Sequence, residues 1–208
     1  MGDGWVRDRT AGWFGIGFLV LLLGSEGALT LPDADASAAS VADFYDAHAG
    51  TVMVLQVVGF AACVLLGLFA YRLRVDDRRV AVTGMVLAAV AAVPAAITLV
   101  LAAVADPAHP GRAGTLNDLE PRGDDLLFLG VLLFALAVAA GPRSPGWLRG
   151  LAAAVAALTA VRLVAELFGS ATGVLASLAP VAFLLLVAAL VVVVFRGRTP
   201  GGRHLRAL

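Results

Sequence analysis

The stretch VLASLAPVAFLLLVAALVVVVF, residues 174–195, contains no charged side chain. A helix needs about 20 mostly apolar residues to cross the hydrocarbon core of a bilayer, so this stretch is long enough to span a membrane. The rest of the chain has the same character, because 61% of its 208 residues are hydrophobic and 14% are charged. Soluble domains carry about 45–50% apolar and about 25% charged residues. The composition therefore predicts an integral membrane protein.

Outward from this stretch, five more segments are long and apolar enough to span. The predicted helices cover residues 11–31, 51–71, 80–105, 124–141, 150–168 and 174–195. The fourth is the weakest, because its uninterrupted apolar part is short, and a re-entrant hairpin is the alternative there. We predict an all-α fold in one membrane domain over residues 1–208, a polytopic transmembrane six-helix bundle. Residues 196–208 would form a flexible cytoplasmic tail.

The arginines predict the orientation of this bundle. The chain has no lysine, and twelve arginines fall in the first, third, fifth and last non-membrane segments, against two in the alternate segments. Positive residues stay on the cytoplasmic side, so both termini are expected on the cytoplasmic side of the cell inner (plasma) membrane. The first apolar run is too long for a signal-peptide core and Glu26 interrupts its end, so we expect an uncleaved first helix.

The first external loop, residues 32–50, contains a helical pattern of its own. One face would carry Val41, Phe44, Tyr45 and His48, and the opposite face Asp43 and Asp46. Residues at this spacing share one side of a helix. We expect a short amphipathic helix that lies on the outer bilayer surface.

Small residues in the second span predict close helix packing. Gly59, Cys63 and Gly67 recur every four residues, and small side chains let transmembrane helices approach closely. Pro94 and Pro180 should kink the third and sixth spans. Transporters break helices at corresponding positions of two halves, but these two prolines sit at different depths. Kinks that serve packing are the simpler interpretation.

Ionisable side chains inside a membrane are costly, so they normally face other helices and are paired. Arg162 and Glu166 lie one turn apart in the fifth span, on a polar stripe with Thr159. We expect a polar cluster in the outer half of the bundle. Its members would be Glu26, Gln56, Asp124, Asp125, Thr159, Arg162 and Glu166.

Two interpretations of this cluster remain open. It could bind a polar or anionic ligand, with Arg162 as a fixed positive charge and Glu26 or Glu166 as a proton acceptor. It could equally be a structural ion-pair network that satisfies itself, because an arginine between two glutamates is already neutralised.

Other functional classes find little support in the sequence. The single Cys63 excludes an intramolecular disulfide, and no basic patch with interleaved aromatics indicates nucleic-acid binding. His48 and His109 lie in external loops without the spacing of a metal motif, so we predict neither a metal nor a cofactor. No nucleophile motif, phosphate-binding loop or dinucleotide fingerprint occurs.

These exclusions favour a non-enzymatic accessory, sensor or lipid- or small-molecule-binding component. Its partners would be membrane lipids and a second copy of the chain or another membrane protein. A small proton- or potential-coupled transporter is the first alternative. The second is an intramembrane enzyme that uses Glu26 or Glu166 as acid or base on a lipid or isoprenoid.

Three segments carry a resemblance in layout. They are Val41-Ala-Asp-Phe-Tyr-Asp-Ala-His48, Phe69-Ala-Tyr-Arg-Leu-Arg74 and Pro142-Arg-Ser-Pro-Gly-Trp-Leu-Arg-Gly150. With the span pattern, they make the chain similar to bacterial, in particular actinobacterial, six-helix membrane proteins that are grouped as a domain of unknown function. The resemblance implies the architecture alone, and it implies no activity and no site residues.

Overall fold

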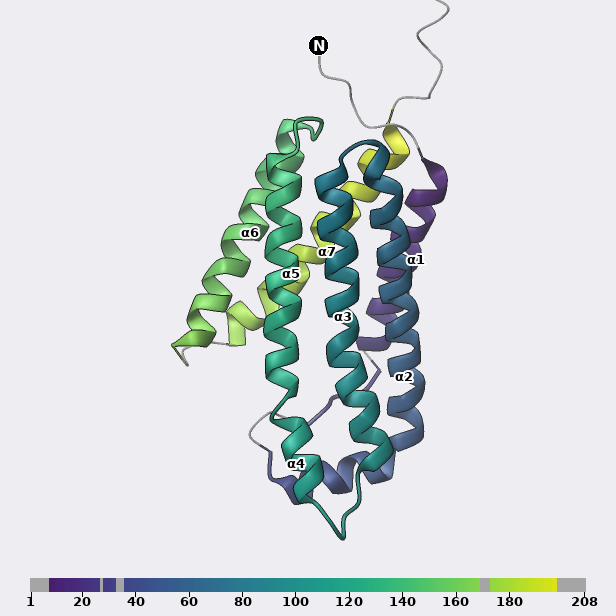
Figure 1. Cartoon of the computed structure of the whole chain (residues 1–208), viewed down its shortest axis with the longest axis vertical. Helices are drawn as coiled ribbons and strands as arrows, with labels where there is room; N and C mark the ends of the chain where they lie inside the picture. Colours follow the sequence, from purple (N-terminus) through teal and green to yellow (C-terminus); the bar gives the residue numbers. More distant parts are fainter. Residues whose placement is uncertain (1–7, 27, 33–35, 169–172, 198–208) are drawn as a thin grey trace, which may run out of the picture.

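The computed structural model describes residues 8–26, 28–32, 36–168 and 173–197, and these residues contain helices and no strand. The helices are α1 (Arg9–Glu26), α2 (Ala38–Arg72), the short 3-10 helix η1 (Leu73–Val75), α3 (Arg78–Val104), α4 (Gly111–Asn117), α5 (Glu120–Ala140), α6 (Gly146–Leu167) and α7 (Gly173–Arg196). The predicted all-α fold is confirmed (Figure 1).

Five helical segments of the described chain are long and apolar enough to cross a bilayer, and α1 is a shorter apolar helix. Large apolar side chains such as Val57, Val64 and Leu185 point outward and are about three-fifths exposed, as a lipid-facing surface requires. The third, fifth and sixth predicted spans correspond to α3, α6 and α7. Both α3 and α7 continue through their internal prolines, Pro94 and Pro180.

Helix α1 ends earlier than the predicted first span. It has 18 residues, about 27 Å at 1.5 Å per residue, and stops at Glu26 instead of residue 31. The apolar residues that follow, Leu29 and Leu31, pack against a second hydrophobic core at the end of the molecule away from the N-terminus. The predicted end is wrong because hydrophobicity alone does not distinguish a side chain in lipid from one buried in protein.

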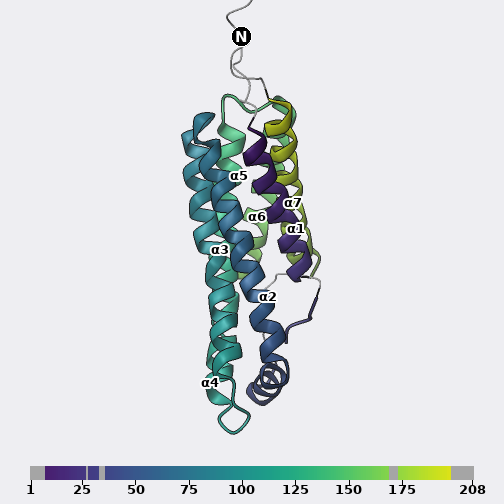
Figure 2. The ribbon, with the colours of Figure 1, turned by 90° about the vertical axis from the view of Figure 1, so that its right-hand side faces the viewer.

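Helix α2 includes the predicted amphipathic helix and continues from it into the second span. The Ser37 hydroxyl accepts a hydrogen bond from the Ser40 N–H at 3.2 Å and so caps its start. The N-terminal part of α2 lies across the long axis before the helix turns along it (Figures 1 and 2).

The expected faces of this N-terminal part of α2 are largely present. Val41 and Tyr45 are fully buried, and Asp43 and Asp46 are exposed. However, the buried face packs on protein in the second core, whereas the sequence predicted that it would face the bilayer. His48 lies on the same side as Phe44, because the two rings stack with centroids 4.6 Å apart, but its side chain is exposed.

Helix α5 starts earlier than the predicted fourth span, at Glu120. Pro121 lies in its first turn, where a missing N–H costs nothing and the fixed φ favours a helix. The helix then runs without a break to Ala140, which rules out the re-entrant hairpin. The loop before it contains the short helix α4, which the sequence did not predict; its Ala113 is buried in the second core.

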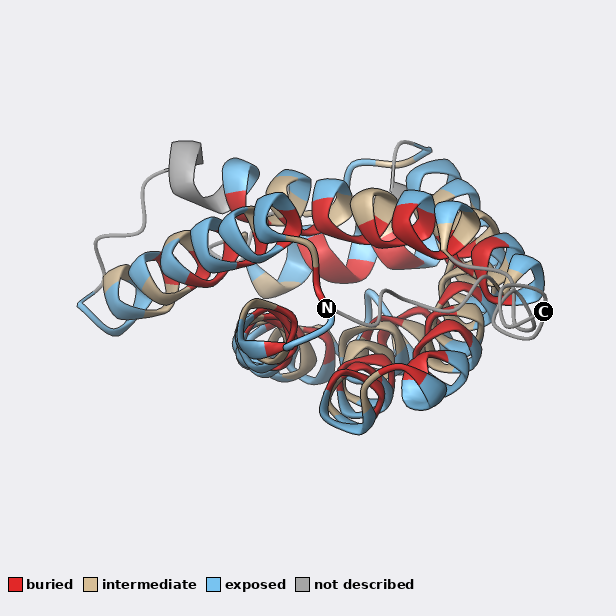
Figure 3. Cartoon of the chain, turned by 90° about the horizontal axis from the view of Figure 1, so that it is seen from above, coloured by how far each residue is buried: buried red, intermediate tan, exposed pale blue. Residues whose placement is uncertain are grey.

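The six long helices form a closed ring, because each packs against its neighbours in the order α1, α2, α3, α5, α6, α7 and α7 packs back on α1. Small residues make the contacts close. A Cβ on Gly67 would meet Ala88 at 3.5 Å, and one on Gly84 would meet Ala70 at 2.7 Å. Buried residues face the inside of the ring and exposed residues cover its outside (Figure 3).

Aromatic side chains fill the centre of the ring. The Phe183 ring of α7 packs edge-on against Phe18 of α1 and Phe134 of α5, with centroids 6.2 and 6.5 Å away. Phe69 of α2 and Phe134 are fully buried. The middle of the bundle is therefore a packed core.

At the end away from the N-terminus, the longer helices extend beyond the shorter ones. The 27 residues of α3 span about 40 Å, whereas the hydrocarbon core of a bilayer is about 30 Å thick. Figure 1 shows α2, α3 and α4 reaching further than α1 and α6 at the end away from the N-terminus. The second core, built from residues such as Tyr45, Leu101 and Ala113, holds this end together.

Candidate functional site

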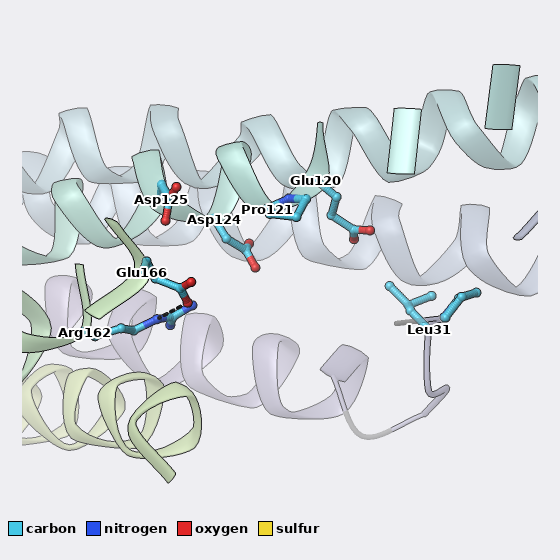
Figure 4. A pocket seen from close by; sticks show the side chains of 8 residues that line it. Leu31, Glu120, Pro121, Asp124, Asp125, Arg162 and Glu166 are labelled. Atoms are coloured by element: carbon cyan, nitrogen blue, oxygen red, sulfur yellow. Dashed lines mark ion pairs between the residues drawn. The ribbon is translucent and has the colours of Figure 1, made fainter. Parts of the chain in front are cut away.

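A cavity of about 380 Å³ opens where α5 begins and α6 ends (Figure 4). Its walls come from the stretch after α1, the first turns of α5 and the last turns of α6. The described residues that line it are Leu31, Pro32, Glu120, Pro121, Asp124, Asp125, Arg162 and Glu166. The cavity thus brings together four members of the predicted cluster, namely Asp124, Asp125, Arg162 and Glu166.

Arg162 is the most buried charged group of this cavity. Its side chain is 10% exposed, and its guanidinium carbon lies 3.4 Å from the centre of the Phe128 ring. Its Nε is 4.0 Å from Glu166 Oε1 and makes no hydrogen bond although it is shielded from solvent. Asp124 and Asp125 of α5 also interact electrostatically with the guanidinium.

The acidic wall opposite this pair is built on the start of α5. Glu120 lies in the first turn, where a negative charge is stabilised by the helix dipole. The hydroxyl of Thr98 on α3 lies 3.2 Å from Glu120 Oε1 and 3.1 Å from the Pro94 carbonyl, so it donates to one of these acceptors. Figure 4 shows the Asp124 carboxylate extending from α5 into the space in front of the Arg162–Glu166 pair.

The predicted polar stripe on α6 faces other helices at Thr159 and Arg162, whereas Glu166 is exposed. Thr159 and Arg162 are buried, while Val161 and Val164 on the other side are about half exposed. However, Thr159 does not line the cavity. Its hydroxyl donates a 2.8 Å hydrogen bond to the Val155 carbonyl of its own helix.

The two other predicted members lie elsewhere. Gln56 is half-buried on α2, and the described lining of the cavity does not include it. Glu26 is the last residue of α1, and its side chain falls outside the described part of the chain.

His48 on α2 and His109 in the loop before α4 make local contacts. His109 Nδ1 lies 2.8 Å from Asp106 Oδ2, and His48 Nδ1 lies 2.9 Å from the Phe44 carbonyl. The Ala108 N–H also donates to Asp106, and these two hydrogen bonds lower the pKa of the Asp106 carboxyl, the His109 contact being the larger cause. Within the described residues, no three acidic, histidine or cysteine side chains are placed to hold a metal ion.

Sequence reasoning missed Glu120 and the apolar side of the cavity, formed by Leu31, Pro32 and Pro121. A usable signal for Glu120 was present, because Glu-Pro is a common way to begin a helix and an acid in the first turn is favourable. Leu31 and Pro32 had no such signal, because they line the cavity only as a result of the direction that the chain takes after α1.

No protein-family model, curated protein or solved structure matches this chain. Functional inference therefore depends on the residues of the cavity and on the packing around it. The likeness to bacterial six-helix membrane proteins stays an expectation drawn from sequence layout.

Proposed function

We propose that this chain is a non-enzymatic integral membrane protein that binds a small molecule in the cavity around Arg162, as an accessory or sensory component of a bacterial inner membrane. The observation that carries the proposal is a buried guanidinium whose Nε has no hydrogen bond and which faces a cavity. Buried hydrogen-bond donors in proteins nearly always have a partner. A bound ligand that accepts a hydrogen bond from the Arg162 Nε would supply the missing one.

The charge distribution supports an outward-facing position for this cavity. Arginines such as Arg72, Arg74, Arg143 and Arg149 lie at the opposite end of the bundle and are exposed. An arginine-rich end is expected on the cytoplasmic side, where it meets anionic lipid headgroups. Both termini would then be cytoplasmic, and the cavity would be reached from outside the cell.

The packed centre of the ring favours binding over transport. A transported molecule would have to pass the Phe18, Phe134 and Phe183 rings, which fill the middle of the bundle. The lining of the cavity also favours binding over covalent chemistry, since its described residues include no hydroxyl, thiol or imidazole group. Carboxylate acid–base chemistry on a lipid and proton-coupled transport are the alternative functions.

Native mass spectrometry of the protein purified in mild detergent, with metal analysis of the same sample, tests the proposal. We expect a retained small molecule or lipid in the wild type and its loss in Arg162→Met. Arg112→Met is the matched control, because Arg112 is an exposed arginine on α4 at the same end of the molecule. The same spectra report whether the chain forms a homo-oligomer. Retention that is equal in wild type and Arg162→Met would refute the proposed role of this cavity.

A further inference from the structure

The gap between Arg162 and Glu166 matches the size of one bridging oxygen atom. The Arg162 Nε lies 4.0 Å from Glu166 Oε1, which is beyond hydrogen-bond distance. An oxygen placed about 2.9 Å from the nitrogen and about 2.7 Å from the carboxylate fits this separation, with an angle of about 90° between its two contacts. A hydroxyl group can make both contacts, because it accepts a hydrogen bond from Nε and donates one to the carboxylate.

A simple ion cannot make both contacts. An ammonium group carries no acceptor, so it leaves the Arg162 Nε unpaired. An ionised carboxylate or phosphate accepts from Nε, but its oxygen then lies within about 7 Å of the Glu166 carboxylate, since a hydrogen bond adds about 2.9 Å to the separation of 4.0 Å. Like charges this close repel each other, and more strongly at a site partly shielded from water. The pair therefore favours a neutral group that both accepts and donates.

Glu166 is the side chain that can admit a ligand atom to this position. The Arg162 Nε is shielded from solvent, and the Phe128 ring covers one face of the guanidinium. The Glu166 side chain, in contrast, is 37% exposed and lies in the last turn of α6, so a change of its rotamer can uncover Nε. A hydroxyl that enters from the cavity is then held when the carboxylate returns and accepts its proton in a hydrogen bond.

The rest of the lining suits a carbon frame that carries further hydroxyl groups. Asp125 is exposed on α5, and a carboxylate offers about four acceptor positions for hydroxyl donors. Leu31, Pro32 and Pro121 add an apolar wall that can contact the C–H groups of such a frame. The cavity volume of about 380 Å³ lies in the range of small-molecule sites.

We propose that the occupant of this cavity is a neutral polyhydroxylated molecule, a sugar or a cyclic polyol, with one hydroxyl that bridges Arg162 Nε and Glu166. This inference rests on the proposed binding function and names the chemical class of its ligand. It keeps the polar ligand that the sequence suggested and sets aside the anionic one, and Glu166 accepts a hydrogen bond instead of a proton. A free sugar and the sugar headgroup of a glycolipid carry the same hydroxyl chemistry.

Four small probes test the ligand class: glucose and myo-inositol are neutral polyols, putrescine only donates hydrogen bonds, and succinate only accepts them. Binding to the full chain is measured by saturation-transfer difference NMR in a polyoxyethylene detergent, which contains no sugar. We expect a neutral polyol to bind and the two ions not to bind.

Two substitutions of one residue test the hydroxyl bridge. Glu166→Leu removes the acceptor and should weaken polyol binding by about tenfold or more. Glu166→Gln keeps an acceptor oxygen without the charge and should bind the polyol within about threefold of the wild type. The matched control is Asp46→Leu, which replaces an exposed carboxylate of α2 at the same end and should bind as the wild type does.

Other outcomes overturn the inference in distinct ways. If putrescine or succinate binds and the polyols do not, the cavity binds ligands but the class is wrong. If Glu166→Gln weakens polyol binding as much as Glu166→Leu, charge and not a hydroxyl bridge determines binding. If Asp46→Leu weakens it as much as Glu166→Leu, the polyol does not bind in this cavity.

The native spectra of wild type and Arg162→Met separate the remaining cases when no polyol probe binds. An Arg162-dependent molecule that fragments as a neutral glycolipid supports the inference with a lipid-linked sugar, and any other retained molecule refutes the inference but not the proposed function. If the spectra show no Arg162-dependent molecule, the proposed function fails as well, and the Nε is satisfied by water.

Discussion

Replacing Phe128 with leucine removes the ring that the Arg162 guanidinium covers at 3.4 Å. A cation over an aromatic ring contributes about 0.5–1 kcal/mol at exposed sites and about 2 kcal/mol when desolvated. The upper end applies here, because the Arg162 side chain is 10% exposed. Phe128 is itself buried, so the smaller side chain also leaves a gap. The free energy of unfolding should fall by about 2–3 kcal/mol in total.

A double-mutant cycle separates the cation–π contact from the lost packing. Arg162→Met keeps an unbranched side chain and removes the charge, and the two single variants and the double variant are compared with the wild type. We expect a coupling free energy of about 1–2 kcal/mol between the two positions. Unfolding is followed by far-ultraviolet circular dichroism during titration of mixed micelles with dodecyl sulfate. A coupling below about 0.3 kcal/mol, within the error of additivity, would refute the view that the ring positions the guanidinium.

Three further predictions concern the helix packing of the bundle, the second core and the loop before α4. Gly84→Ala should lower the free energy of unfolding by about 1–2 kcal/mol in the same titration, because the new methyl group would lie 2.7 Å from the Ala70 Cβ. Gly67→Ala is the control and should leave this free energy unchanged, since its methyl group would lie 3.5 Å from the Ala88 Cβ. Equal effects of the two substitutions would contradict the packing argument. Tyr45→Phe should leave that free energy unchanged or raise it by about 1 kcal/mol, because the buried hydroxyl has no hydrogen bond, and a clear loss would reveal a partner. His109→Ala should raise the pKa of the Asp106 carboxyl in a carbon NMR titration. Because the pKa of Asp106 is lowered in the folded loop, its contact with His109 stabilises the loop at neutral pH, and this stabilisation is lost as the pH falls through the lowered pKa. An unchanged pKa in His109→Ala would show that His109 does not cause the shift.

The spans could be predicted from the sequence because lipid imposes one requirement on all of them, a long apolar run with its backbone hydrogen bonds satisfied internally. The errors fall where protein replaces lipid around an apolar side chain. Leu29 and Leu31 were assigned to the first span and instead pack in the second core, where Val41 and Tyr45 lie as well. Periodicity identified the buried face of α2, but it could not distinguish a face on the bilayer from a face on α4.

The candidate site was predictable to the extent that charge in a membrane helix is rare. Arg162 and Glu166 were identified for that reason, and the structure places them in one cavity with the aspartates of α5. Thr159 and Gln56 show the limit of this reasoning. A hydroxyl can be satisfied by the carbonyl one turn earlier in its own helix, as Thr159 is, so a polar residue on a buried face does not by itself indicate a site.

The geometry around Arg162 favours an incomplete network over a self-contained one. A charged side chain in a membrane helix costs about 2.5–3.5 kcal/mol on insertion scales, and a purely structural ion pair would offset that cost by closing to hydrogen-bond distance. The distance from Arg162 to Glu166 is 4.0 Å, and the Nε makes no hydrogen bond. On the other side of the cavity, α5 begins well before its apolar run at Leu126 and so presents further carboxylates at the same level. Native mass spectra of the wild type and Arg162→Met therefore distinguish a network that a ligand completes from one that needs no ligand.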